Sequence, residues 1–294
     1  MTENGVNSIH LDGVCRISRP HGDALPLIFD SPHSGTVFPP DFKPAIKREQ
    51  VLSCADLYVD RLFLDAPLHG AVLLAAEFPR VYVDANRAAD DVAPDTVADW
   101  SGPARPTEKA HLGKGLVWLA VKPDATPVYK TKLTAKEIQN RIEHYYKPYH
   151  DALDALVNGA HRKIGKVWHV NCHSMQPLSG VMDAEGPDIQ RADIVLSDRD
   201  GTTCAPAFIH AMRDSLKAAG LEVAINQPFK GAEIIKRHGA PAEGRHSVQI
   251  EINRRLYLNL QTLEPSTHFA DMKAIIDALL KDLASFVQGE LERA

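Results

Sequence analysis

The sequence contains few cysteines, and none of them are closely spaced. The four are Cys15, Cys54, Cys172 and Cys204, and no Cys-x-x-Cys pair occurs. A disulfide framework or a structural zinc ribbon needs paired or clustered cysteines, so neither is indicated. We expect reduced and partly buried thiols.

Long apolar runs are also missing. No run approaches the roughly 18 residues that a membrane span needs. Residues 1–19 contain acids, Asn and Gly, where a signal peptide would have an apolar stretch. These absences predict a cytoplasmic protein with no membrane partner.

The chain has no excess of basic residues. It contains 33 Lys and Arg against 38 Asp and Glu, for a net charge of −5. A broadly basic surface for nucleic acid is therefore not expected. A local basic pocket is compatible with this charge, and an acidic substrate would need one. The sequence carries no signal for an oligomeric state.

Short apolar runs alternate with helical patterns along the 294 residues, and no linker divides them. This alternation predicts an α/β fold with a mostly parallel sheet, in one domain covering residues 1–294. A capping box formed by Thr134 and Glu137 predicts a helix start, and residues 86–127 form a long excursion with little regular structure. The strands are expected at residues 25–30, 71–76, 81–84, 167–171, 193–196, 221–225 and 248–252, and the helices at 46–65, 134–159, 206–219 and 269–291.

Two histidines follow predicted strands directly, in the clusters Ser31-Pro32-His33-Ser34-Gly35 and Asn171-Cys172-His173-Ser174-Met175. Sites in α/β sheets form at the carboxyl ends of strands, so His33 and His173 could converge on one metal ion. The alternative is that each is a core or hydrogen-bonding histidine. A nucleophilic pair of Cys172 and His173 is disfavoured, because adjacent residues of an extended chain point to opposite sides.

Asp56 is the expected carboxylate ligand. In the predicted helix 46–65 it falls on the apolar face that includes Leu52 and Val59. A carboxylate on a buried face needs a metal ion or an ion-pair partner, and both readings remain open. Two histidines, a carboxylate and water form the ligand set of a catalytic zinc hydrolase. Asp60 is the rival carboxylate, or a hydrogen-bonding partner of a ligand.

Two further clusters suggest substrate binding and catalysis. Arg87, at the end of Arg-Val-Tyr-Val-Asp-Ala-Asn-Arg, could bind a carboxylate bidentately, with Asn86 as a further donor. The alternative is that Arg87 is solvated or pairs with Asp84. Strand alternation places Glu251 on the face opposite the apolar residues of 248–252. There it could accept a proton from water, or it could be a salt-bridged glutamate on an edge strand.

These clusters resemble the N-formylglutamate amidohydrolase family. The resemblance covers roughly residues 25–285 and rests on the order of the motifs, which also include Asp-Leu-Tyr-Val-Asp at 56–60, Asn-Gln-Pro-Phe-Lys-Gly at 226–231 and Gln-Ile-Glu-Ile-Asn-Arg at 249–254. It implies a phosphorylase/hydrolase-like α/β fold, shared with zinc carboxypeptidases and aspartoacylase. That superfamily takes two ligands from His-x-x-Glu, whereas Thr36 stands three residues after His33 here. We therefore assign the second ligand position to Asp56.

The resemblance also implies roles for the site residues. One Zn²⁺, or another divalent ion, would be held by His33, Asp56 and His173. Glu251 would be the general base, and Arg80 would polarise the scissile carbonyl. The substrate would be held by Asn86, Arg87, Ser174, Arg199 and Lys230, with Arg245 as a further candidate cation.

The implied activity is zinc-dependent hydrolysis of N-formyl-L-glutamate to formate and L-glutamate, as in histidine degradation, with a small acidic N-acyl amino acid as the partner. One alternative is a related zinc deacylase or carboxypeptidase that acts on another N-acyl acidic amino acid. Another is a non-catalytic module that captures acidic metabolites through Arg87.

Overall fold

The computed structural model describes residues 6–121, 124–181, 183 and 185–293, and within these residues eight strands form one mixed sheet. Its order is β1-β2-β4-β3-β7-β10-β8-β9. The strands are β1 (Val6–Leu11), β2 (Cys15–Pro20), β3 (Leu27–Ser31), β4 (Val72–Ala76), β7 (Val167–Met175), β8 (Ile194–Ser197), β9 (Val223–Ile225) and β10 (Arg245–Asn253), and a separate hairpin contains β5 (Ala120–Val121) and β6 (Thr126–Pro127).

The four central strands β4, β3, β7 and β10 run parallel. Strand β2 pairs antiparallel with β1 and β4, and β8 pairs antiparallel with β10 but parallel with β9. The predicted α/β class with a mostly parallel mixed sheet is confirmed. Because the carboxyl ends of parallel strands meet at one edge, side chains near the carboxyl ends of β3, β7 and β10 come together there. His173 lies within β7, because this strand extends to Met175, four residues beyond its predicted end.

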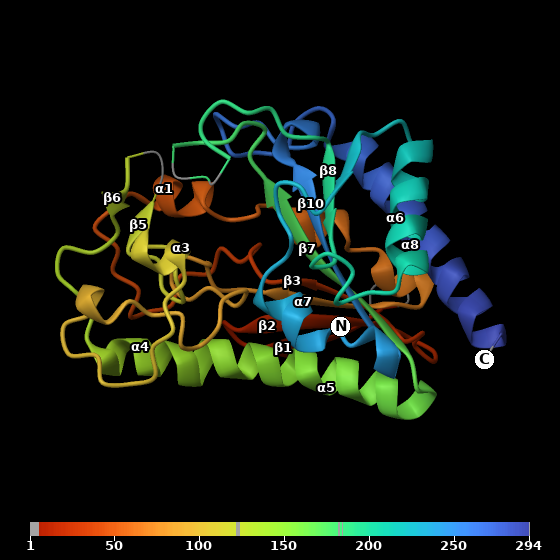
Figure 1. Cartoon of the computed structure of the whole chain (residues 1–294), viewed down its shortest axis with the longest axis horizontal. Helices are drawn as coiled ribbons and strands as arrows, with labels where there is room; N and C mark the ends of the chain where they lie inside the picture. The colour runs from red at the N-terminus through yellow and green to blue at the C-terminus, as the bar shows by residue number, and fades with distance from the viewer. Residues whose placement is uncertain (1–5, 122–123, 182, 184, 294) are drawn as a thin grey trace.

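Helices cover both faces of the sheet, so the fold has three layers. Leu27 and Phe29 of β3 face the core that contains α6 and α8, while Ile28 faces the core under α5. Figure 1 shows α4 and α5 along one side of the sheet and α6 and α8 on the other. The helices are α1 (Arg48–Ser53), α2 (Val59–Leu62), α3 (Glu108–His111), α4 (Ala135–Arg141), α5 (Lys147–Ile164), α6 (Pro206–Ala218), α7 (Glu233–His238) and α8 (Phe269–Glu292), with short helical turns η1 (Ala66–His69), η2 (Pro94–Thr96), η3 (Ile142–Tyr146), η4 (Pro241–Glu243) and η5 (Arg254–Leu256). None of these described helices is both long enough and apolar enough to cross a membrane.

The helix predicted to begin at Thr134 is confirmed. The Thr134 side chain accepts a hydrogen bond from the Glu137 backbone N–H, and the Glu137 side chain accepts one in return. These bonds satisfy N–H groups that have no partner within the helix. Through η3 the helix continues into α5 and ends at Ile164, five residues beyond the predicted end, because Gly165 adopts a left-handed φ of 82°.

The continuous helix predicted over residues 46–65 is wrong. The chain forms α1, turns over residues 54–58, with Tyr58 at φ 63°, and then forms α2. The turn arises because the Asp56 N–H donates to the carbonyl of His33 at 2.9 Å, a contact with another loop that helical spacing does not reveal. Asp56 is fully buried as expected, but in a turn and not on a helix face.

The strand predicted at residues 81–84 is also wrong. These residues form a turn whose groups bond to the excursion: Trp118 N–H donates to Val81 O, and Asp84 N–H donates to Leu116 O. The described residues of the excursion 86–127 have little regular structure, as predicted. Residues 122–123 of this segment lie outside the described residues. The outer strands β1 and β2 were not predicted, because their mixed polar sequences lack a clear apolar run.

Candidate metal and active site

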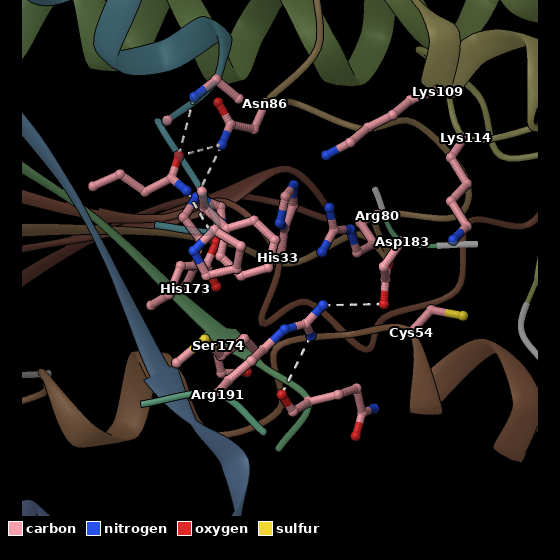
Figure 2. Close-up of a pocket in the computed structure, with 18 of the residues that line it drawn as sticks. His33, Cys54, Arg80, Asn86, Lys109, Lys114, His173, Ser174, Asp183 and Arg191 are labelled. Carbon is pink, nitrogen blue, oxygen red and sulfur yellow. Dashed lines mark hydrogen bonds and ion pairs between the residues drawn. The ribbon is translucent and has the colours of Figure 1, made fainter. Parts of the chain in front are cut away.

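A cavity of about 380 Å³ opens at the carboxyl edge of β7 and β10. Its wall is strongly cationic although the whole chain is acidic. The described basic residues on it are Arg80, Arg87, Lys109, Lys114, Arg191, Lys230 and Arg254, against the acids Asp183, Glu185 and Glu251. Figure 2 shows the side chains of Lys109 and Lys114 extending toward the cavity that contains His33 and Arg80. Such a wall suits a substrate with more than one negative charge.

Three buried side chains meet at the base of this cavity. His33 Nδ1 lies 3.3 Å from Asp56 Oδ2, and His173 Nδ1 lies 3.0 Å from the same oxygen. All three ligand atoms lie within 4.8 Å of one another, so these residues could hold a metal ion. Tetrahedral ligands at about 2.0–2.1 Å from zinc stand about 3.4 Å apart, which matches this spacing.

The second ring nitrogen of each histidine, Nε2, is also hydrogen-bonded in a way that fits metal binding. His33 Nε2 lies 2.7 Å from Asp84 Oδ1 and His173 Nε2 lies 2.6 Å from Asn171 Oδ1. When an ion is bound, a histidine that donates from Nε2 can offer the lone pair of Nδ1 to the ion, and ligand histidines are usually held in this way.

Asp56 itself is shared between the histidines and two arginines. Its Oδ1 accepts from Arg254 at 3.0 Å and lies 3.6 Å from Arg80, while Oδ2 faces the two histidines. Burial alone would raise the pKa of Asp56, but hydrogen bonds from His173 and His33 and the charge of Arg80 hold this pKa well below its ordinary value. The carboxylate is therefore ionised, as a ligand must be.

The loop that carries His33 is tied to the turn that carries Asp56. Ser34 Oγ donates to the Asp56 carbonyl at 3.0 Å and accepts from the Asp60 N–H at 3.2 Å. On its other side the loop packs directly on backbone: a Cβ added at Gly35 would lie 2.3 Å from Phe78 O. The Ser-Pro-His-Ser-Gly motif therefore needs glycine at its last position for a steric reason.

Gly35→Ala should destabilise the fold by about 1–3 kcal/mol and weaken metal binding, because the backbone contact forces the His33 loop to move. Gly159→Ala is the matched control, since an added Cβ at this position in α5 meets nothing within 4 Å and alanine favours a helix. Urea unfolding and metal analysis of both variants test this. A Gly35→Ala protein as stable and as metal-rich as the parent would contradict it.

Glu251 stands next to His173 in the β10–β7 register and lines the cavity. Burial raises its pKa to about 7, with a further contribution from Asp56, against the lowering charges of His173, Arg80 and Lys109. A carboxyl with a pKa near neutrality is well suited to general-base catalysis. The strand β10 lies between β7 and β8, so Glu251 is not on an edge strand.

Arg80 lies over Trp118, with its Cζ 4.7 Å from the ring centroid, and pairs with Asp84 Oδ2 at 3.0 Å. Trp118 Nε1 donates to the same oxygen at 3.0 Å. Burial would raise the pKa of Asp84, but the charges of His33 and Arg80 hold this pKa well below its ordinary value. Arg80 is therefore fixed beside the metal ligands and faces the cavity.

Arg87 and Lys109 line the cavity, and neither forms an ion pair with any described residue. Arg87 Nε donates to the Lys114 carbonyl at 3.2 Å. Burial lowers the pKa of Lys109 to about 8, and the positive charges of Arg87 and Arg80 lower it further. Two cations that form no ion pair with a described carboxylate could bind an anionic group of a substrate.

The other expected substrate residues are placed differently. Asn86 Nδ2 lies within 3.3 Å of Asn171, His173 and Gln249, and its Oδ1 accepts from Ile234 N–H, so its amide is already engaged by the protein. Ser174 Oγ accepts from Arg254 Nε at 3.0 Å.

The candidate cations Lys230, Arg199 and Arg245 also differ in position. Lys230 lines the cavity and pairs with Asp200 at 2.8 Å. Arg199 does not line it, and its guanidinium donates to the Gly231 carbonyl instead. Arg245 also lies off the cavity wall and donates to Asn158.

Sequence reasoning did not assign roles to several residues of the cavity wall, or to Asp84, which contacts His33 and Arg80. Asp84 and Arg254 were within quoted motifs, so their position in those motifs was the available signal. Lys109 and Lys114 lie in the irregular excursion, where no periodicity marks them. Arg191, which pairs with Asp183 and Glu185, comes from the segment that follows β7.

An enzyme that hydrolyses the amide of an acidic amino acid needs ligand atoms for one ion, a base with a pKa near neutrality and cations for the anionic substrate. The cavity contains all three. Their position at the carboxyl edge of the α/β sheet indicates an enzyme that hydrolyses amide bonds. Comparison with known proteins then identifies the family. The model of the N-formylglutamate amidohydrolase family matches residues 25–258, and the chain belongs to that family of amide-bond hydrolases.

Individual relatives agree. The chain is 42% identical to N-formylglutamate amidohydrolase from Ralstonia eutropha JMP134, whose crystal structure superposes with a TM-score of 0.90 over 95% of this chain and 99% of that one. It is 25% identical over 268 residues to N-formylglutamate deformylase from Pseudomonas putida, which covers 90% of this chain and 92% of that protein. The deformylase of Pseudomonas aeruginosa is 26% identical over 264 residues, covering 88% and 91%.

Proposed function

We propose that this chain hydrolyses N-formyl-L-glutamate to formate and L-glutamate with one divalent ion, zinc by preference, held by His33, Asp56 and His173. The observation that carries the proposal is the convergence of three buried ligand atoms beside Glu251 in a cationic cavity. The names of the relatives support the choice of substrate.

A bound divalent ion supplies a Lewis acid that polarises the amide carbonyl and lowers the pKa of water to about 7. Glu251 takes the proton of the attacking water and passes it to the leaving nitrogen, so that water and amide become formate and amine. Arg80, fixed by Asp84 and Trp118, stabilises the negative charge that develops on the carbonyl oxygen.

The carboxylates of the substrate would bind to the basic residues that line the cavity. We assign one carboxylate to Arg87 and Lys109, the two cations without an ion-pair partner among the described residues. Arg87 provides two parallel N–H donors, and Lys109 provides a point charge. This arrangement favours an N-acyl amino acid over a neutral amide. From the family we place the reaction in histidine degradation.

Metal analysis and a substrate panel test this proposal. The purified protein is expected to contain one equivalent of zinc, to lose activity on chelation and to prefer N-formylglutamate over N-acetylglutamate and peptidyl glutamate. His33→Ala and His173→Ala should each lose the metal. Retention of metal by both variants would contradict the ligand assignment, and equal turnover of the acetyl or peptidyl compound would contradict the formyl specificity.

A further inference from the structure

We propose that Tyr146 is a positioning residue for Arg87, and that it thereby sets the affinity of the cavity for a carboxylate of the substrate. The inference rests on the proposed function, in which Arg87 binds that carboxylate. Tyr146 is buried and lies outside the cavity wall. Its hydroxyl donates to the Arg87 carbonyl oxygen at 2.9 Å, so its contact is with the backbone that carries the arginine.

This contact is one of three that join the turn of residues 80–87 to a single long helix. Figure 1 shows α4 and α5 in one continuous line, with η3 between them. The three hydrogen bonds run from Arg141 Nη1 to Tyr82 O, from Tyr146 Oη to Arg87 O and from His150 Nε2 to Ala85 O, each at 2.9 Å. All three donor side chains are buried. Because the turn is not part of the sheet, its buried carbonyls need such donors from side chains.

The three donors share one face of the helix because η3 is a π-helical turn, in which the Lys147 N–H bonds to the Ile142 carbonyl five residues back. A regular α-helix turns by about 100° per residue. Tyr146 and His150 follow Arg141 by five and nine residues, so in an α-helix they would lie about 140° and 180° away from it. The wider turn takes up one residue and reduces these angles to about 40° and 80°.

Arg87 is held from two other sides as well. Its N–H donates to the Asp84 carbonyl at 3.1 Å, and its Nε donates to the Lys114 carbonyl at 3.2 Å. Neither terminal nitrogen of its guanidinium bonds to a described residue, so both can reach a carboxylate in the cavity. Burial raises the pKa of the Tyr146 hydroxyl, which therefore keeps its proton and donates. Loss of this donor frees the backbone of Arg87 and with it the direction of the guanidinium.

Tyr146→Phe should raise KM for N-formylglutamate about 3–10-fold, the effect of losing one hydrogen bond, while kcat stays near that of the parent. Tyr145→Phe is the matched control, because it removes a hydroxyl from the adjacent residue. The Tyr145 ring packs on Phe78 and Tyr82, and its hydroxyl bonds to no described residue. Its KM should match that of the parent. Equal KM values in the two variants would overturn the inference.

A double-mutant cycle with Arg87→Ala separates the positioning of Arg87 from a general effect on the fold. If Tyr146 acts through Arg87, Tyr146→Phe raises KM in the parent but not in the Arg87→Ala background, where no side chain is left to position. An increase by the same factor in both backgrounds would mean that Tyr146 supports only the fold, and would overturn the inference.

Binding of L-glutamate to the purified protein, measured by calorimetry, gives a readout that needs no turnover. The Kd should rise by a similar factor in Tyr146→Phe and stay unchanged in Tyr145→Phe. A protein that shows this difference but does not hydrolyse N-formylglutamate would contradict the proposed reaction and still support the inference. Equal Kd values in the two variants, in a protein that does hydrolyse it, would overturn the inference and leave the reaction standing.

Discussion

Glu251→Gln is expected to lower kcat by about 10²–10⁴-fold while metal content stays at the wild-type level. Glutamine has nearly the shape of glutamate but cannot accept the proton of water. The side chain accepts from Gln249 Nε2 at 2.9 Å and lies outside the His33–Asp56–His173 set. Removing its charge should therefore affect proton transfer far more than metal binding.

Steady-state kinetics on N-formylglutamate, with metal analysis alongside, provide the measurement. Glu264→Gln is the matched control, because it makes the same chemical change on an exposed residue that does not line the cavity. Its kcat should match that of the parent. A Glu251→Gln enzyme with near-normal kcat would place the base elsewhere in the cavity.

Arg87→Ala is expected to raise KM by roughly 30-fold to several-thousand-fold, since breaking a buried hydrogen-bonded charge pair costs about 2–5 kcal/mol. Arg87→Lys should raise KM less, because lysine keeps the charge but loses the planar two-pronged grip. Stability should change little in either variant, because none of the described carboxylates forms an ion pair with Arg87.

Kinetics and thermal melts of both variants test this assignment, with Arg213→Ala as the control for loss of an arginine. Arg213 lies on α6 and pairs with Asp214, away from the cavity. An unchanged KM, or a large loss of stability with normal kinetics, would mean that Arg87 supports the fold and that the substrate carboxylate binds elsewhere.

Asp56 illustrates how far sequence reasoning reached into the site. Helical spacing predicted that it is buried, and it is, but the helix itself is interrupted there. The apolar spacing of residues 46–65 reports which side chains face the core. It does not report that the Asp56 backbone bonds to the carbonyl of His33, because that partner lies 23 positions earlier in the chain.

The basic residues of the cavity wall show what sequence reasoning could not predict. Arg87 follows a recognisable motif, but Lys109, on the same wall, lies in a segment without periodic structure. Arg199 and Lys230, two of the candidate cations, are close in space, yet only Lys230 lines the cavity. Charge and position along the chain are visible in a sequence, whereas the direction of a long side chain depends on the backbone around it.

The sequence by itself determined the α/β class, most of the apolar strands of the sheet, the capped helix at Thr134 and the position of His33 and His173 at strand ends. These features depend on periodicity, capping and turn chemistry, which act over a few neighbouring residues. Only the tertiary structure decided that Asp56 reaches both histidines and that Arg87 lacks an ion-pair partner among the described residues. Each of these depends on contacts between segments far apart in the chain, and such contacts exist only once the sheet and its loops have packed.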